Sequence, residues 1–491
     1  MLSLYYNKIN NNLKTTKCFY KYNVTNYTYQ DSFEYVNKIL PILKKNKNIF
    51  TYSNKSFEMY SSIFPILISG STWIPISINL PINKIKIILQ KVKPDLLLYD
   101  FDNKEVIKLF REFGTKCIHY KKVYKFKKKK NNINNKIKKI NFSKTAFIYF
   151  TSGSTGNPKG IKISHKNIIT DIFEQKKHLY KNIKNLKQLI FADYYDTAFS
   201  IFFDIYFPAI YFNASISPGL LQEEIFLPTE HIKKNNVNVI VAVPSTIQRI
   251  INYHKKKNLF KIKILIITGE PFYLALLKKI FKLNLSMNVF NCYGATEMGN
   301  WVFFHKCQKN DVKKYSSLGL VPIGKPFSKV SSKIVNDELV VRGPMITKGY
   351  LDKNLNDKKF IFSKNNTFYT SDKVIKLKNN IFYCKGRIDS VVKIRGYRVD
   401  LSEIESAFRD IKYIKDVLVF HNLNKLKKYE NYVIAVVSLR IKIKEYELRK
   451  VLSKKLPYYM IPAKIFIIND LPTNINGKID RNKIKNKYHL V

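Results

Sequence analysis

The segment FIYFTSGSTGNPKG, residues 147–160, decides how this sequence of 491 residues is interpreted. An apolar run of strand length leads into small and hydroxyl residues, and Lys159 follows them. Small residues let successive backbone N–H groups point into one concavity, while hydroxyls add donors and a lysine adds positive charge. The spacing of the P-loop is absent. We therefore predict a different cradle for the phosphates of a nucleotide, formed by Thr151, Ser152, Gly153, Ser154, Thr155, Gly156 and Lys159.

A second motif, NCYGATEMGN, covers residues 291–300. Asn291 can bond the edge of an adenine, and the ring of Tyr293 offers a face to the base. Thr296 can donate to an α-phosphate, and Glu297 is a hard oxygen ligand of the kind that Mg²⁺ prefers. Standing alone, the motif would be an ordinary turn with an exposed glutamate.

Three further positions carry suitable side chains. Asp372, in FYTSDKV (368–374), has two oxygens that suit a ribose diol. Arg387, in CKGRIDSVVKIRGYRVDLSEIE (384–405), can contact the ribose or the phosphates, and Asp389 follows it. Lys478 lies on an Asn-Gly turn in LPTNINGKIDRNKI (471–484). For Asp372 the alternative is an ordinary turn, and for Arg387 and Asp389 it is a charged hairpin. Lys478 alone would normally mean nothing, because the chain is rich in lysine.

Outside the motifs, strand-length apolar runs alternate with helical patterns. The runs at 92–100, 144–150, 237–243 and 262–268 predict strands, and PFYLALLKKIFK (271–282) predicts a helix. This alternation predicts an α/β fold with largely parallel sheets. From about residue 337 short β-like runs take over, and a tail of about a hundred residues reads strand, helix, strand, strand, helix. The Lys/Asn-rich stretch 121–140 is interpreted as a solvated surface excursion.

Composition excludes several classes of protein. The formal net charge of +52 suggests a polyanion partner. However, the excess comes mostly from lysine beside Asn, Ile, Tyr and Phe, all with A/T-rich codons, and arginine is scarce. We therefore attribute the charge to codon bias and expect no nucleic-acid function. No apolar run of 18 residues and no signal sequence is found, so no membrane insertion is expected. Five scattered cysteines fit a reducing, cytoplasmic location.

The order of these motifs resembles the adenylate-forming (AMP-binding) superfamily over nearly the whole chain. Within this superfamily, the chain most resembles the branch of the stand-alone amino-acid adenylation domains and the D-alanine:carrier-protein ligases. Further segments that match the branch in order are YTYQDSFEYVNKI (27–39), ILISGSTWIPISINLP (66–81), ITGEPF (267–272), IGKPF (323–327), ELVVRGPMITKGYL (338–351) and LPYYMIP (456–462).

The resemblance implies a large N-terminal domain, 1–387, of α/β subdomains with mostly parallel sheets and a β-barrel-like part. A small mobile α+β domain, 388–491, would follow, with Asp389 as its hinge. The implied activity is attack of a carboxylate on the α-phosphate of ATP, forming an acyl-adenylate and releasing pyrophosphate. The implied cofactors are ATP and Mg²⁺, with the metal on Glu297 and with Lys478, Thr296 and Glu297 as the catalytic residues. Cys292, Gly294 and Ala295 would join Asn291, Tyr293, Thr296, Asp372, Arg387 and Lys478 around the nucleotide.

The expected substrate is a small carboxylic acid, above all an amino acid, passed to a phosphopantetheinylated carrier protein in trans. In amino-acid-activating members an Asp in an FDxS motif binds the ammonium group. The corresponding stretch, DYYDTAFSIFFDIYFP (193–208), has no acidic residue at the matching position, where either Phe199 or Ser200 falls. Asp196 can serve if the chain slips by a few residues. An acyl- or aryl-CoA ligase acting on a non-amino acid is the alternative. The expected pocket residues are Asp196, Phe199, Ser200, Phe203, Ile267, Cys292 and Asn300.

Overall fold

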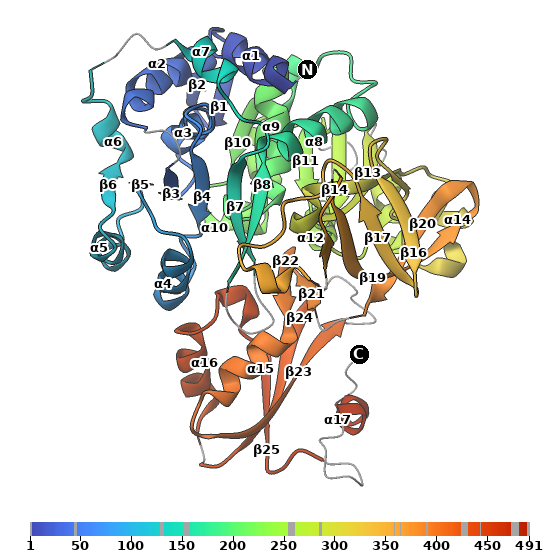
Figure 1. Cartoon of the computed structure of the whole chain (residues 1–491). Coiled ribbons are helices and arrows are strands. Elements are labelled where there is room, and N and C mark those ends of the chain that lie inside the picture. The colour runs from blue at the N-terminus through green and yellow to red at the C-terminus, as the bar shows by residue number, and fades with distance from the viewer. Residues whose placement is uncertain are drawn as a thin grey trace. The chain divides into compact units, whose positions relative to one another are not determined.

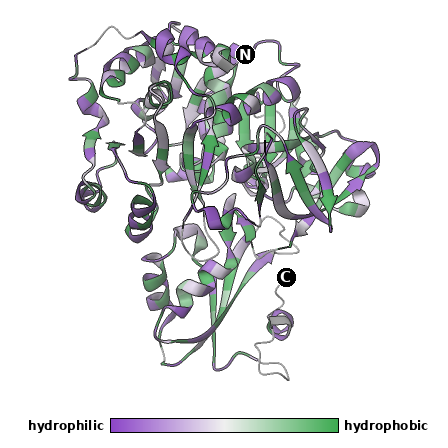
Figure 2. Ribbon diagram, in the orientation of Figure 1, coloured by the Kyte–Doolittle hydropathy of each residue, from purple (hydrophilic) through white to green (hydrophobic). Residues whose placement is uncertain are grey.

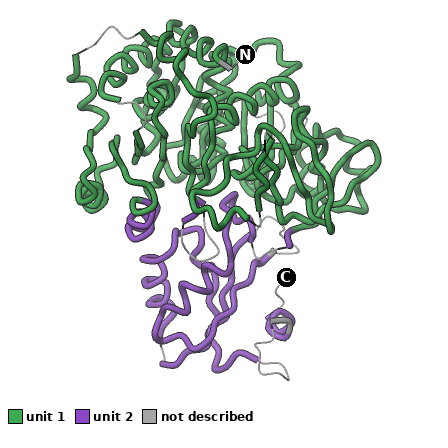
Figure 3. The backbone as a smooth tube through the Cα atoms, viewed as in Figure 1, with its two compact units in different colours: residues 1–78, 89–150, 160–386 green, residues 79–88, 151–159, 387–491 purple. Residues whose placement is uncertain are grey.

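The computed structural model divides the chain into two compact units (Figure 3). Unit 1 comprises Met1–Ile78, Leu89–Phe150 and Gly160–Gly386, and unit 2 comprises Asn79–Ile88, Thr151–Lys159 and Arg387–Val491. The predicted division into domains 1–387 and 388–491 stays a prediction. Two short segments from before residue 387, Asn79–Ile88 and Thr151–Lys159, group with unit 2. The structure describes residues 2–43, 47–127, 132–151, 158–253, 261–283, 287–357, 359–363, 365–388, 391–423, 431–441, 443–472 and 481–488.

The largest sheet of the described residues has nine strands, of which the central ones are parallel (Figure 1). Parallel strands end at the same edge of a sheet, so the loops that follow them gather there. Asp193, Ala242 and Thr268, the last residues of three of these strands, therefore lie along one edge of the sheet. In spatial order the strands are β15 (Lys325–Pro326), β14 (Asn300–Lys306), β13 (Asn288–Ala295), β12 (Ile264–Thr268), β11 (Val239–Ala242), β9 (Ile190–Asp193), β10 (Ser215–Pro218), β1 (Cys18–Tyr22) and β2 (Thr25–Thr28).

Two more sheets precede residue 388. The first is six-stranded, with parallel pairing from β6 to β7, and its order is β6 (Lys116–His119), β5 (Leu96–Tyr99), β3 (Asn48–Tyr52), β4 (Thr72–Ile76), β7 (Thr145–Thr151) and β8 (Lys159–Ser164). The second is antiparallel along its main path, and its strands are β16 (Ser331–Val335), β17 (Glu338–Arg342), β19 (Thr367–Leu377), β18 (Phe360–Ile361) and β20 (Ile381–Arg387).

Helices alternate with these strands. They are α1 (Leu2–Asn12), α2 (Tyr29–Ile39), α3 (Phe57–Ile68), α4 (Ile82–Lys91), α5 (Lys104–Glu112), α6 (Tyr120–Val123), α7 (Ile133–Lys138), α8 (His165–His178), α9 (Ile201–Phe212), α10 (Gln222–Phe226), α11 (Thr229–Lys234), α12 (Pro244–Tyr253), α13 (Leu274–Lys282) and α14 (Asp311–Lys314). No helix among the described residues combines the length and the apolar character needed to cross a membrane.

Aromatic and branched residues fill the core of unit 1. Helix α9 is apolar on all sides, as its sequence IFFDIYFPAIYF requires for a fully buried helix. Its Phe203 and Phe207 rings pack on Phe147 of β7, and the Trp73 ring also contacts Phe147, in an edge-on arrangement. Hydrophobic residues are concentrated in the inner strands and in α9 (Figure 2). This packing fixes the N-terminus of α9, which borders the candidate site.

Unit 2 contains an α+β arrangement with its own core. A hairpin, β21 (Val391–Ile394) and β22 (Tyr397–Asp400), is followed by α15 (Leu401–Arg409). Strands β23 (Ile414–Leu423) and β24 (Asn431–Leu439) are antiparallel, and β25 (Lys464–Ile468) lies parallel to β24. Helices α16 (Glu445–Ser453) and α17 (Arg481–Lys487) complete the unit. Ile404, Phe408, Val419 and Leu448 are all buried in one apolar cluster.

These elements confirm the predicted α/β fold class. One interpretation was wrong. The Lys/Asn-rich stretch 121–140 is not only a solvated excursion, because Val123, Ile133 and Ile137 are buried in the main core. Its helix α7 also contacts α1, which covers this end of unit 1 (Figure 1). The lysines and asparagines masked an apolar spacing of four residues between Ile133 and Ile137.

Candidate functional site

The turn from β13 through a short 3-10 helix (Thr296–Met298) into β14 forms the centre of the site. Gly294 is required there, because a Cβ atom on it would lie 1.8 Å from the carbonyl oxygen of Asn300. Gly299 has φ +77°, and a Cβ on it would lie 2.1 Å from the carbonyl oxygen of Met345. The glycines thus let the backbone fold back tightly, so that Thr296 and Glu297 occupy the tip.

Thr296 meets the beginning of α9. Its Oγ1 donates to Ser200 Oγ at 3.2 Å, and Asn300 Nδ2 donates to the carbonyl oxygen of Ser200 at 3.0 Å. The structure therefore brings together one predicted catalytic residue, Thr296, and two predicted pocket residues, Ser200 and Asn300.

Glu297, the predicted metal ligand, is held rigidly. Its side chain is buried, and Tyr350 donates its hydroxyl to Oε1 at 2.8 Å. Its backbone carbonyl accepts from the N–H and the hydroxyl of Thr347, at 3.1 and 2.8 Å. A buried carboxylate with a fixed orientation supplies the hard oxygen that Mg²⁺ prefers, so the residue present fits the metal.

Asp372, predicted to hold a ribose, is linked to the same motif. Tyr293 donates its hydroxyl to Asp372 Oδ2 in a short hydrogen bond. Burial and the charge of Asp372 raise the pKa of Tyr293 well above its usual range, so this hydroxyl keeps its proton and remains a donor. Ser371 has φ +59°, a conformation that favours glycine, and its N–H donates to Glu338 Oε1 at 2.6 Å.

Asn291, Cys292 and Ile267 lie in the middle of the sheet. The amide of Asn291 donates to the backbone carbonyls of Pro322 and Val321, at 2.9 and 3.3 Å. Cys292 and Ile267 are buried on neighbouring strands, and burial raises the pKa of the Cys292 thiol well above its usual range. Their predicted contacts with nucleotide and substrate, like those of Gly294 and Ala295, stay predictions.

Asp196 lies in the turn that precedes α9. Its Oδ2 accepts from Ser77 Oγ at 2.6 Å and its Oδ1 from the N–H of Ala198 at 2.9 Å. Phe199 donates its N–H to the carbonyl of Asp196 at 3.0 Å, which closes a turn directly before Ser200. Burial raises the pKa of Asp196, while hydrogen bonds from Ser77 and Ala198 and the charge of Lys55 act in the opposite direction. Phe203 packs in the aromatic core, and its predicted role in the pocket stays untested.

The structure adds a buried network that the sequence reasoning missed. Gln175 Nε2 donates to Asp171 Oδ2 at 2.7 Å and to Asp204 Oδ1 at 2.8 Å. Asn300 Nδ2 donates to Asp204 Oδ2 at 2.5 Å. Burial and mutual repulsion of the two carboxyl groups raise the pKa of Asp204 well above its usual range. A lone aspartate inside the apolar run SIFFDIYFP was the available signal, because such a residue must find buried partners.

Several predicted residues cannot be placed in this site. Ser152, Gly153, Ser154, Thr155, Gly156, Asp389 and Lys478 lie outside the described residues. Thr151, Lys159 and Arg387 group with unit 2, where they end β7, begin β8 and end β20. Within unit 2, burial raises the pKa of Glu403, and the charges of Lys84 and Lys159 act in the opposite direction.

The fold and the gathered side chains define an α/β protein with a candidate nucleotide site at the edge where its parallel strands end. Residues 10–351 match the AMP-binding enzyme family, and residues 403–478 match the AMP-binding enzyme C-terminal domain. The chain belongs to the AMP-binding enzyme family, which confirms the resemblance inferred from the motifs.

Individual relatives are distant. The chain is 27% identical to bacitracin synthase 2 of Bacillus licheniformis over 92% of its own length, but it spans only 18% of that protein. It is also 27% identical to a D-alanine--D-alanyl carrier protein ligase of Bacillus licheniformis, covering 89% of this chain and 88% of the ligase. Among solved structures, the Vibrio cholerae adenylation domain AlmE, in complex with glycyl-adenosine-5'-phosphate, superposes with a TM-score of 0.83 at 20% identity, covering 98% of this chain and 97% of AlmE.

Proposed function

We propose that this protein is an ATP-dependent ligase that activates a small amino acid as an aminoacyl-adenylate. It then transfers the acyl group to the phosphopantetheine thiol of a separate carrier protein. The observation that carries this proposal is the turn at 294–300, in a chain of the AMP-binding enzyme family. The turn carries Glu297 and brings Thr296 and Asn300 into hydrogen bonds with Ser200.

The site residues divide the chemistry between them. Thr296 can donate to an oxygen of the α-phosphate, and Asp372, oriented by Tyr293, can accept from the ribose hydroxyls. Glu297 would hold Mg²⁺, which supplies charge neutralisation for the phosphates. Lys159 would orient the pyrophosphate, and Lys478 would stabilise the negative charge that develops as the carboxylate attacks. Asp389 would be the hinge that withdraws Lys478 for the transfer step.

Asp196 is our candidate for recognition of the substrate ammonium group. It lies in the turn directly before Ser200, and Ser200 contacts Thr296. Asp204, the other carboxyl group near Ser200, is fully buried and bonded to Gln175 and Asn300, whereas Asp196 is only partly buried. An acidic residue beside the substrate is needed, because burial of an unpaired ammonium group is costly. The D-alanine and glycine in the names of two similar proteins support a small amino acid as the substrate class.

The proposal is tested by ATP–pyrophosphate exchange with pairs of acids that differ only in the amino group, such as alanine and propionate. We expect exchange with the amino acid, and we expect Asp196→Asn to raise its KM about tenfold or more, the typical loss for a hydrogen bond to a charged group.

Asp100→Asn is the matched control. Asp100 accepts from Ser53 Oγ at 2.6 Å and from the N–H of Asn54 at 3.0 Å, which closely resembles the pattern at Asp196. Exchange only with fatty or aromatic acids would refute the amino-acid assignment and favour an acyl- or aryl-CoA ligase. An unchanged KM in Asp196→Asn would refute the role of Asp196 alone.

A further inference from the structure

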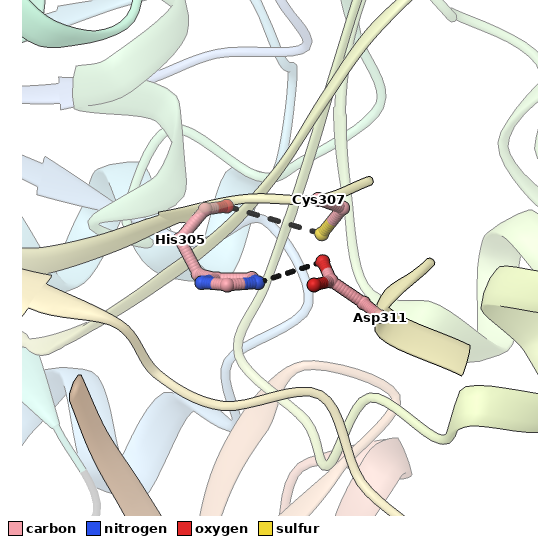
Figure 4. A group of neighbouring side chains, drawn as sticks. All are labelled: His305, Cys307 and Asp311. Atoms are coloured by element: carbon pink, nitrogen blue, oxygen red, sulfur yellow. Dashed lines mark hydrogen bonds and ion pairs between the residues drawn. The ribbon is translucent and has the colours of Figure 1, made fainter. Parts of the chain in front are cut away.

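A compact cluster of three different metal-binding side chains lies where β14 ends. His305 is near the end of the strand, Cys307 follows it, and Asp311 begins α14 (Figure 4). One ligand atom of each residue lies within 4.8 Å of the corresponding atoms of the other two. The sequence reasoning treated Cys307 as an isolated cysteine, because no CxxC spacing is present.

The spacing of these atoms is close to that of a tetrahedral zinc site. With Zn–N, Zn–O and Zn–S distances of about 2.0–2.3 Å, two ligand atoms of a tetrahedron are about 3.3–3.8 Å apart. His305 Nε2 lies 2.9 Å from Asp311 Oδ2, and all three atoms are within the 4.8 Å limit. Shifts of about an ångström or less would therefore bring the three atoms around one ion.

The chemistry of the donors selects the class of metal. A thiolate, an imidazole and a carboxylate together suit Zn²⁺ and the related Co²⁺, whereas Mg²⁺ prefers oxygen ligands and several waters. Cys307 and Asp311 are buried, which protects an ion from exchange with solvent. The nearby hydroxyl of Tyr315 is buried and has no hydrogen-bond partner among the described residues, and its ring lies edge-on to His305 at 5.9 Å. This hydroxyl is available to orient a fourth ligand, such as a water molecule.

The cluster is hydrogen-bonded to β13, the strand that carries the nucleotide motif. His305 is the direct neighbour of Asn291 across the β13–β14 pair, and the N–H of Cys307 donates to the carbonyl of Val289 at 2.9 Å. Asp311 Oδ2 also accepts from the N–H of Gln308 at 2.8 Å, which closes the loop between strand and helix. An ion held here would brace the end of the sheet next to Asn291.

We propose that His305, Cys307 and Asp311 form a structural Zn²⁺ site. The ion binds Nε2 of His305, a carboxylate oxygen of Asp311 and the Sγ thiolate of Cys307. The proton of the Cys307 thiol passes to solvent on binding, and a water occupies the fourth position. No step of the ligase reaction depends on this ion.

The test uses the purified full-length chain, freed of metal with a chelator and titrated with Co²⁺ and then with Zn²⁺. We expect one equivalent of Co²⁺ to produce the near-ultraviolet thiolate-to-cobalt band, and Zn²⁺ to displace it. Cys307→Ser should abolish the band, and Asp311→Asn should weaken binding about tenfold or more. Cys117→Ser is the control, because Cys117 lies on β6 in a different sheet, and this variant should keep the wild-type band.

Asp311→Asn is a second variant that should keep the fold, because the asparagine Oδ1 can still accept from the N–H of Gln308. Absence of the band in the folded wild-type chain, or its persistence in Cys307→Ser, would overturn the proposal. Because the readout is metal binding, failure here leaves the proposed ligase activity untouched.

Discussion

Gly294 is the residue at which the backbone of β13 comes nearest to that of β14. A Cβ there would lie 1.8 Å from the carbonyl oxygen of Asn300 and 2.7 Å from Cα of Trp301, and neither backbone atom can move independently. We predict that Gly294→Ala lowers the free energy of unfolding by about 3 kcal/mol, at the upper end of overpacking costs. Pyrophosphate exchange should fall at least about tenfold, because Thr296 and Glu297 follow directly.

Gly114→Ala is the control for this change. Gly114 has φ +72°, and a Cβ on it would meet no atom within 4 Å, so only the cost of the backbone conformation, about 1 kcal/mol, is expected there. Equal thermal shifts for the two variants would contradict the close approach of the strands.

His165 gives a prediction about pH. Burial lowers its pKa from 6.5 to about 4. Its Nδ1 forms a hydrogen bond with the hydroxyl of Tyr6, and the two atoms are 2.6 Å apart. As the pH falls below 6.5, His165 takes up a proton in the unfolded chain but not in the folded chain. The free energy of unfolding therefore decreases with falling pH until about pH 4, where the folded chain also takes up the proton. From about pH 7 to about pH 5 this residue should lower the free energy of unfolding by about 2 kcal/mol.

Urea denaturation at the two pH values measures this slope in the wild type and in His165→Gln. The glutamine can still bond Tyr6 but does not titrate, so the variant should lose about 2 kcal/mol less. Parallel pH dependence in both proteins would exclude His165 as the cause.

Single residues also show where sequence reasoning ended. Thr296 and Glu297 could be chosen as candidates because their motif is local, and the structure places both in one short turn. Their catalytic roles stay predictions. The partners that orient them, Ser200 and Tyr350, are distant in sequence, and no short pattern encodes such pairings. Ser371, directly before Asp372, has a positive φ, a backbone conformation that favours glycine.

Among the elements, the N-terminus of α8 connects to the loop that supports the site. Asn167 accepts at Oδ1 from the N–H and Oγ of Ser164, at 2.8 and 2.7 Å. Its Nδ2 donates to the carbonyls of Pro344, Met345 and Ile346, at 2.9–3.1 Å. The carbonyl oxygen of Met345 would lie 2.1 Å from a Cβ on Gly299, so the Asn167 side chain links the helix cap to the segment that packs against the turn carrying Thr296 and Glu297.

We predict that Asn167→Asp is destabilising by about 3 kcal/mol, because it retains the cap acceptor but sets a carboxylate oxygen against three carbonyls. The matched control is Asn132→Asp at the start of α7, where Asn132 Oδ1 accepts from the N–H of Asn135 at 3.0 Å on the surface. Thermal unfolding of the two variants measures the difference. A comparable loss in both would show that the cap, not the loop, is affected.

Elements were predictable wherever the local pattern was strong. The apolar runs at 144–150, 237–243 and 262–268 became β7, β11 and β12. The first strand predicted for the C-terminal tail is instead a hairpin, because Arg395 and Gly396 adopt positive φ and separate β21 from β22. Strand β25 was missed, because two of its five residues are exposed and its short pattern KIFII has no clear alternation.

For the whole molecule, the charge of +52 leads to a prediction about nucleic acids. A diffuse lysine excess gives loose phosphate contacts that exchange with counterions, so binding should weaken steeply with salt. We expect filter binding of duplex DNA to be detectable at low salt and lost at physiological salt. Tight binding that survives physiological salt would contradict codon bias as the origin of the charge.

The division into units was the least predictable property. A boundary near residue 387 follows from a change of pattern, but the grouping of Asn79–Ile88 and Thr151–Lys159 with the C-terminal part has no local signal. Contacts between segments hundreds of residues apart arise from packing, which one sequence does not display.

The pairing of β1 with β10 has a consequence for synthesis of the chain. Tyr20 on β1 is the parallel neighbour of Ile216, almost two hundred residues later. At about 5–20 residues per second, a ribosome needs about 10–40 s to supply that neighbour. The edge hairpin β1–β2 therefore leaves the exit tunnel long before its permanent partner exists. The rate of translation between these two strands therefore sets how long the unpaired edge of β1 is exposed to chaperones or to other nascent chains.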